Sequence, residues 1–229
     1  PFFRPVAGSN LGLVYAYAGM HDRSVDALQQ SLDAAREGEE VFGEALALVI
    51  LGWSSLDLQD AGRARIFLER ALTVTETAGL EREYWSAQAG IGEAARLEGD
   101  FKAAFALLRG KRDWEGVRAA DNVRVIGAAW IRLLRALIEG GERAAAVDEL
   151  EVLDALLARA PGPVADYFAP ELQLARARLS LGDGAHDRAR ALADAAERAF
   201  AMRGDESAAL EAMAVRAQAL RSLAPEQAL

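Results

Sequence analysis

The chain has 229 residues, of which 52% are hydrophobic and 27% charged, so it holds enough apolar surface to fold around a core. A net charge of -9 and a pI of about 4.9 argue against direct contact with nucleic acid, which requires a basic surface. Cysteine is absent, and no run of about 18 apolar residues occurs, so disulfides, thiolate metal sites and membrane spans are excluded and a cytoplasmic protein is expected.

Helix-forming residues dominate the composition, chiefly Ala, Leu, Arg, Glu and Gln. Amphipathic periodicity and turn residues predict eleven helices, at residues 5–18, 22–37, 41–58, 61–78, 82–98, 101–110, 117–139, 142–159, 164–181, 187–203 and 205–222. The last helix is expected to close the final hydrophobic surface as a cap. Its packing face is predicted to consist of Leu210, Met213, Ala214, Ala217 and Leu220.

An aliphatic residue followed by glycine recurs every 40 residues, as Leu11-Gly12, Leu51-Gly52 and Ile91-Gly92. Each glycine falls in the middle of a predicted helix, where glycine costs about 1 kcal/mol relative to alanine. The close approach of a paired helix would offset that cost. The small residues expected to face the glycines are Ser24, Ala64 and Ala104.

A turn follows each pair, at Gly19-Met20, Gln59-Asp60 and Gly99-Asp100, and an amphipathic stretch follows each turn. Two less exact copies continue the pattern, with turns at Gly141-Glu142 and Gly182-Asp183. Each unit is therefore predicted to be a hairpin of two helices. The segment from Gly110 to Asn122, which contains Trp114, breaks the pattern, either as a shortened helix with the tryptophan folded back or as a kink with an exposed aromatic contact.

This order of Leu-Gly, an aromatic or small residue, Gly-Asp and then Ala resembles the tetratricopeptide repeat, and Tyr15, Phe101 and Trp130 fall where that pattern favours aromatic residues. The 40-residue period is similar to the extended repeats of MalT-like bacterial regulators. The resemblance implies an all-α, right-handed superhelical solenoid of five hairpins and a cap, forming one domain over residues 1–229. The expected repeats are 5–38, 41–79, 82–118, 119–160 and 164–203, with the cap at 205–222. Because the chain begins at Pro1 instead of methionine, we also expect a fragment of a larger protein.

In this family the first helix of each hairpin lines the concave surface that binds partners. Carrying that register over predicts a groove for a protein or peptide that is apolar at one end and arginine-bearing at the other. The three arginines fall at related heights in successive repeats and suit bidentate capture of a carboxylate. The residues expected to form the groove are Tyr17, Trp53, Glu93, Arg96, Arg135 and Arg176.

No catalytic, cofactor or metal site is expected. The only two histidines, His21 and His186, fall in separate predicted turns, and no phosphate-binding loop motif occurs. We therefore expect a non-enzymatic protein- or peptide-binding scaffold, the sensor or interaction arm of a bacterial signalling or transcriptional regulator. Two alternatives stay open, namely a small-molecule sensor and a self-associating scaffold that forms a homodimer.

Overall fold

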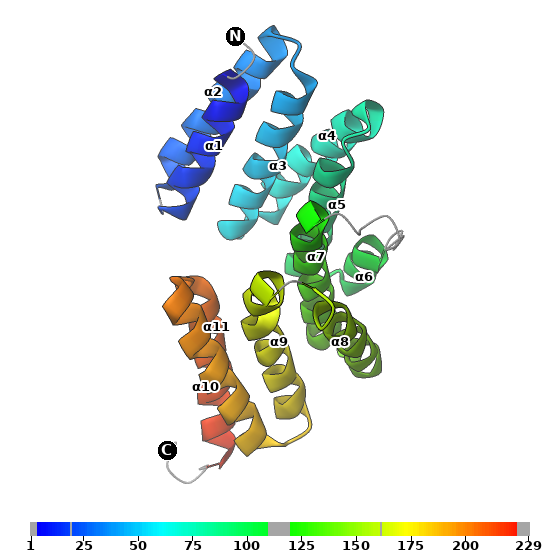
Figure 1. The fold of residues 1–229 in the computed structure, drawn as a ribbon, viewed down its shortest axis with the longest axis vertical. Coiled ribbons are helices and arrows are strands. Elements are labelled where there is room, and N and C mark those ends of the chain that lie inside the picture. Colours follow the sequence, from blue (N-terminus) through cyan, green and yellow to red (C-terminus); the bar gives the residue numbers. More distant parts are fainter. Residues whose placement is uncertain (1–3, 19, 110–119, 161, 224–229) are drawn as a thin grey trace. The chain divides into compact units, whose positions relative to one another are not determined.

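The computed structural model describes residues 4–18, 20–109, 120–160 and 162–223, without the side chains of residues 17 and 120–126. These residues form eleven helices and no strand, which confirms the predicted all-α class (Figure 1). The helices are α1 (Arg4–Tyr17), α2 (His21–Glu37), α3 (Val41–Asp57), α4 (Ala61–Ala78), α5 (Glu81–Leu97), α6 (Phe101–Arg109), α7 (Ala120–Glu139), α8 (Arg143–Leu157), α9 (Gly162–Gly182), α10 (His186–Arg203) and α11 (Glu206–Leu223). Trp114, whose role the sequence left open, lies outside the described residues.

The contacts group the chain into two compact units, residues 1–136 and residues 137–229, and each is described by itself. A single domain over the whole chain and a right-handed superhelix stay predictions. In the described residues, no helix combines the length and the apolar character that crossing a membrane would require.

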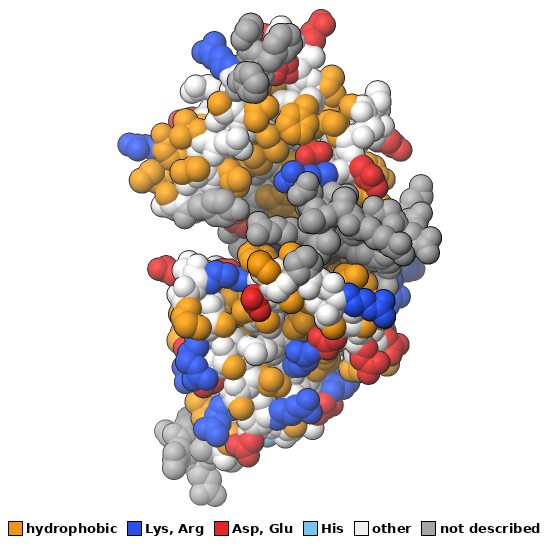
Figure 2. All heavy atoms as spheres, viewed as in Figure 1, with side chains coloured by type: hydrophobic (Ala, Val, Ile, Leu, Met, Phe, Trp, Pro, Cys, Tyr) orange, Lys and Arg blue, Asp and Glu red, His pale blue; other side chains and the backbone are white. Residues whose placement is uncertain are grey.

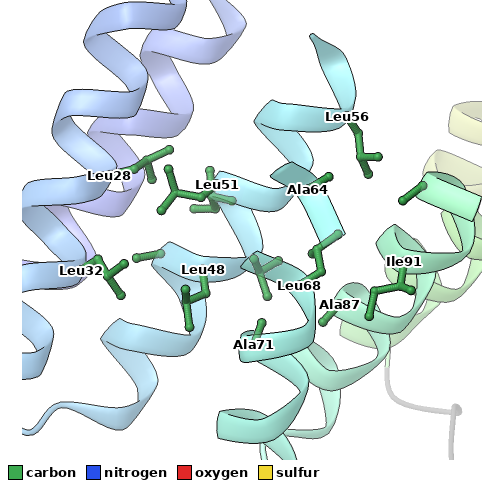
Figure 3. Packing of buried hydrophobic residues seen from close by; sticks show 14 residues of the cluster. Leu28, Leu32, Leu48, Leu51, Leu56, Ala64, Leu68, Ala71, Ala87 and Ile91 are labelled. Carbon is green, nitrogen blue, oxygen red and sulfur yellow. The ribbon is translucent and has the colours of Figure 1, made fainter. Parts of the chain in front are cut away.

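Unit 1 consists of successive helical hairpins, in which α1 packs on α2, α3 on α4 and α5 on α6. The first helices of neighbouring hairpins also contact one another, since α3 touches both α1 and α5. Leucine and alanine side chains fill the space between these helices, as Figure 3 shows for Leu28, Leu51, Leu68 and Ile91. Burying this apolar surface is the main stabilising contribution to such a fold.

The recurring glycines sit where the second helix of a hairpin approaches closely, as predicted. A Cβ atom placed on Gly52 would lie 2.4 Å from Cγ of Leu68, and one on Gly12 would lie 2.5 Å from Cγ of Leu28. Gly92 has the same relation to Leu108, at 2.6 Å. The side chain that fills the space is thus a leucine sixteen residues later.

The small residues that the sequence placed opposite the glycines lie one turn earlier in the second helices. Ser24 donates a hydrogen bond to the carbonyl oxygen of Gly12, at 2.8 Å. Ala64 and Ala104 are fully buried. These small side chains let the hairpin close, while the leucines fill the space at the Cβ positions of the glycines.

The turns follow the chemistry that the sequence indicated. The Asp60 side chain accepts a hydrogen bond from the backbone N–H of Arg63, and Asp100 does the same for Ala103. Gly99, which precedes Asp100, has a φ of 77°, a left-handed conformation that glycine adopts without steric cost. Each hairpin turn thus ends one helix and begins the next within a few residues.

In unit 2, α10 packs against both α9 and α11 around a cluster that includes Phe200 and Val215. Helix α11 packs on α10, but its predicted packing face is wrong, and its role as a cap stays a prediction. Ala212, Val215 and Ala219 are buried. Leu210 is 60% exposed, and Met213, Ala214, Ala217 and Leu220 are also exposed. Apolar residues occupy opposite faces of this helix, and the smaller ones allow the closer approach to α10.

We expect Gly52→Ala to lower the free energy of unfolding by about 1–3 kcal/mol, because the added methyl group overlaps Leu68 and the tight core must shift. Urea unfolding followed by circular dichroism measures the change. Gly62→Ala is the matched control, since only a side-chain oxygen of Asp60 lies near its Cβ position, at 3.8 Å. Equal stability losses in the two variants would contradict the close-approach explanation.

Candidate peptide-binding surface

The first helices of the hairpins in unit 1, α1, α3 and α5, form one continuous surface, because each touches the next. The contacts at two glycines of the central helix α3 identify the faces that neighbouring helices cover. A Cβ atom on its Gly43 would lie 2.8 Å from Cβ of Pro5 in α1 and 3.3 Å from that of Ala35 in α2. Gly52 marks the face turned to α4. Two faces of α3 are therefore closed by neighbouring helices.

An apolar stripe follows the remaining face of α3 through Phe42, Leu46, Val49 and Trp53, at the i, i+4, i+7, i+11 spacing of one helix face. Phe42 is 44% exposed, whereas Val49 is buried. Leu46 and Trp53 are half-buried and pack on the core of unit 1. In Figure 2, hydrophobic side chains gather over α1 and α3 of this unit. This stripe is the apolar part of the candidate surface.

Trp53 connects α3 to two other helices. Its indole Nε1–H donates a hydrogen bond to Oγ of Ser86 in α5, at 3.1 Å. The guanidinium carbon of Arg132 in α7 lies 4.1 Å from the centroid of the Trp53 ring, a cation–π arrangement. Gly90 of α5 lies beside this ring, and a Cβ atom there would lie 3.4 Å from Cε2 of Trp53, whereas its tight contact, at 2.7 Å, would be with Cδ1 of Leu68. The indole is therefore held in place before any partner arrives.

A carboxylate lies near the same arginine. Asp57 is the last residue of α3, one helical turn after Trp53. The surrounding protein partly desolvates the Asp57 carboxyl and raises its pKa, although the residue as a whole is exposed, while the positive charges of Arg132 and His21 lower the pKa by smaller amounts. The end of the apolar stripe thus carries charges of both signs.

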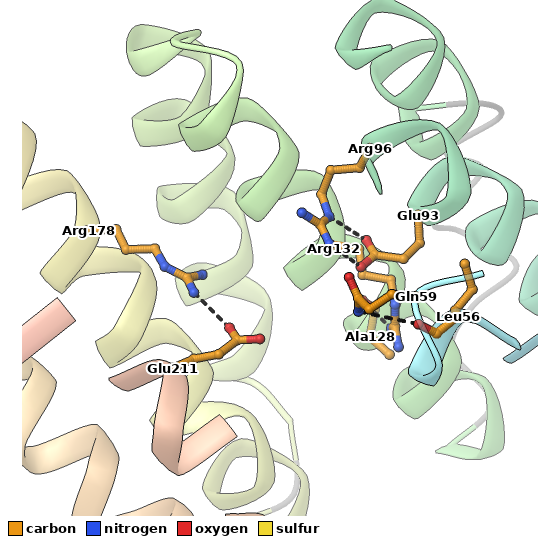
Figure 4. A network of polar contacts seen from close by, with 8 residues as sticks. All are labelled: Leu56, Gln59, Glu93, Arg96, Ala128, Arg132, Arg178 and Glu211. Atoms are coloured by element: carbon orange, nitrogen blue, oxygen red, sulfur yellow. Dashed lines mark hydrogen bonds and ion pairs between the residues drawn. The ribbon is translucent and has the colours of Figure 1, made fainter. Parts of the chain in front are cut away.

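Glu93 and Arg96, two of the predicted groove residues, form an ion pair with each other on α5 (Figure 4). The Nε and Nη2 groups of Arg96 donate to the two carboxylate oxygens of Glu93, at 2.9 Å and 2.8 Å. Both side chains are largely shielded, with 7% exposure for Arg96 and 12% for Glu93. The Nε/Nη2 edge of Arg96 is therefore already occupied by Glu93 and is closed to bidentate binding of a ligand carboxylate.

The other predicted groove residues are distributed over both units. Arg135 is half-buried on α7, in unit 1. Arg176 lies on α9, in unit 2, where it forms an ion pair with Asp154 of α8. Tyr17 ends α1, and its side chain lies outside the described part of the chain. The two residues that hold Trp53, Ser86 and Arg132, are therefore not among the predicted groove residues.

The contributors to this surface that were missed from the sequence include Phe42, Leu46, Asp57, Ser86 and Arg132. Phe42 and Leu46 precede Trp53 at helical spacing, so the stripe was visible in the sequence. Arg132 follows the irregular 110–122 segment, after which the 40-residue spacing no longer aligns the helices. Contact between α3 and α7 could not be inferred without that alignment.

The described residues contain no group of three or more His, Asp or Glu side chains arranged to hold a metal ion. The polar groups around Trp53 consist of a hydroxyl, a guanidinium and a carboxyl. Such groups suit the binding of an apolar side chain and polar backbone around it.

No protein-family model matches the chain, and no curated protein matches it in sequence. Solved structures resemble it closely in fold. The TPR-like repeats of a putative kinesin light chain from Podosopora anserina align with a TM-score of 0.64 at 18% identity, over 89% of this chain and 97% of that one. The fold is that of a tetratricopeptide-type helical repeat.

Two Rap structures share this fold. The apo form of RapI aligns with a TM-score of 0.63 at 11% identity, over 97% of this chain and 85% of RapI. A Rap protein complexed with Competence and Sporulation Factor aligns with a TM-score of 0.66 at 16% identity, over 96% of this chain and 66% of that protein. These likenesses confirm the resemblance to the tetratricopeptide repeat that the sequence indicated.

We expect Arg132→Gln to raise the pKa of Asp57 further above its ordinary range, because the substitution removes a positive charge that lowers it. NMR titration of the Asp57 carboxyl carbon measures the value. Arg63→Gln is the control, since the Arg63 guanidinium lies over Phe67 of α4. An unchanged Asp57 pKa in Arg132→Gln would show that the two groups lie farther apart in solution.

Proposed function

We propose that this chain is a protein- or peptide-binding scaffold, with the surface of α1, α3 and α5 in unit 1 as its binding site. The observation that carries the proposal is the apolar stripe of α3, in which a tryptophan is fixed by Ser86 and Arg132 but remains half-exposed. A rigid aromatic residue in a partly open site is the typical centre of a binding hot spot.

The partner best suited to this surface is a segment with apolar side chains on one side. Such a segment would bury Phe42, Leu46 and Trp53, while its polar groups would meet Asp57 and Arg132 at the end of the stripe. Arg96 and Arg176 already form ion pairs with acidic side chains of this chain. We therefore propose that the partner binds mainly through apolar contacts and not through a carboxylate. Arg135 and Tyr17 remain proposed contacts.

We further propose that the chain serves as the sensor or interaction arm of a bacterial signalling or transcriptional regulator in the cytoplasm. The support is the likeness of fold to a Rap protein that was solved in complex with Competence and Sporulation Factor. The scaffold carries this role without an enzymatic activity of its own, and a partner domain would produce the output.

Selection of a displayed random-peptide library on the whole chain tests the binding site. We expect enriched peptides to contain apolar residues and to bind the Phe42→Ser/Trp53→Phe variant about tenfold or more weakly, because hot-spot side chains contribute most of the binding free energy. Fluorescence anisotropy of labelled peptides gives the dissociation constants.

Ile66→Ser is the matched control, since Ile66 is 62% exposed on α4, a second helix of a hairpin. This variant is expected to keep the affinity of the wild-type chain. Failure to enrich any peptide, or enriched peptides that bind all variants equally, would reject the proposed site. Circular dichroism of each variant verifies that its helices are intact.

A further inference from the structure

Helix α11 has apolar residues on two opposite faces. Ala212, Val215 and Ala219 are buried on the face turned to the rest of unit 2. On the opposite face, the exposed fraction is 60% for Leu210, 42% for Met213 and 41% for Leu220. Ala214 and Ala217 lie between these larger residues and are exposed too. A helix with apolar residues on both sides is suited to pack on both sides.

The exposed face has the residue spacing of a helix pair. Leu210, Met213, Ala217 and Leu220 follow one another at intervals of three, four and three residues. This alternation keeps apolar side chains on one seam between two helices that pack along their length. Alanine within the seam lets the two backbones approach closely. The exposed face of α11 is therefore fitted to receive a second helix.

The charges at the two ends of the seam indicate the direction of that second helix. Glu206 stands four residues before Leu210, and Arg221 directly follows Leu220. Both are exposed, lie on the side of the open seam, and form no ion pair within the part of the chain that is described. In contrast, Arg216 and Glu211 on the flanks of α11 are paired with Glu197 and Arg178.

We propose that the chain forms a two-fold symmetric homodimer in which α11 packs antiparallel against α11 of a second copy. In this arrangement Leu210 meets Leu220 of the second copy, and Met213 meets Ala217 of the second copy. Glu206 then lies within about three residues, or about 4.5 Å along the axis, of Arg221 of the second copy. Because of the two-fold symmetry, each of these contacts occurs twice in the dimer. A parallel pair would instead place Glu206 beside Glu206 and Arg221 beside Arg221, and these like charges would repel.

This surface is distinct from the proposed peptide site, which lies on unit 1, so the two can be tested separately. Sedimentation equilibrium of the whole chain from about 1 to 100 µM measures the dimer dissociation constant. We expect Met213→Lys to raise that constant by about tenfold or more, because it places a charge in the seam. Met202→Lys is the matched control, since Met202 is 85% exposed at the end of α10 and is expected to leave dimerisation unchanged.

Charge reversal tests the antiparallel direction. Glu206→Arg and Arg221→Glu should each weaken the homodimer, because each places like charges opposite one another at both ends. A mixture of these two variants should dimerise more tightly than either alone, since opposite charges then meet at both ends.

A chain that is monomeric throughout this concentration range would overturn the proposal. So would a dimer that Met213→Lys leaves intact, including one broken instead by Leu11→Lys on the exposed side of α1. A mixture of the charge-reversed variants that dimerises no better than its components would overturn the antiparallel arrangement. Circular dichroism of every variant separates loss of the dimer from loss of the fold.

Discussion

The contact between a glycine of one helix and a leucine of the next sets the geometry of each hairpin in unit 1. At Gly52 there is no room for even a methyl group, since the Leu68 side chain occupies the place of a Cβ atom. The two backbones therefore come closer than larger side chains would allow, and the same arrangement recurs 40 residues earlier and later. The cost of glycine within a helix is offset by the packing that the close approach permits.

This close packing also determines what remains exposed on α3. Neighbouring helices close the faces marked by Gly43 and Gly52, so a single narrow stripe is left for contact with a partner. Trp53 is held there by groups from α5 and α7, and its orientation does not depend on a ligand. A preformed aromatic surface of this kind loses little conformational entropy on binding, which favours affinity without a large contact area.

The helices and their pairing could be predicted because the same residues recur at a fixed interval. Gly12, Gly52 and Gly92 mark positions at which the paired helix packs too closely for a Cβ atom. The packing face of α11 could not be predicted, because apolar side chains lie on both of its sides and periodicity does not say which side is buried.

Of the ion pairs formed by the predicted groove arginines, one could be predicted from the sequence and one could not. The pair of Glu93 and Arg96 has a spacing typical of ion pairs within a helix, so it was visible in the sequence. Arg176 meets Asp154 across 22 residues and two helices, a contact that depends on how the helices pack. The position of Arg132 could not be predicted, because the repeat pattern of the sequence is interrupted between residues 110 and 122.

Apart from the contact of Arg132 with Trp53, the polar contacts between helices described above join residues that are fewer than 40 positions apart in the sequence. Trp53 and Ser86 are 33 residues apart, as are Arg178 and Glu211, and Arg143 reaches the Leu179 carbonyl across 36 residues. Little chain entropy is lost when such contacts form, so folding can begin in any hairpin and spread to its neighbours. Unfolding can likewise proceed from an end, one hairpin at a time, while the hairpins farther along the chain stay ordered.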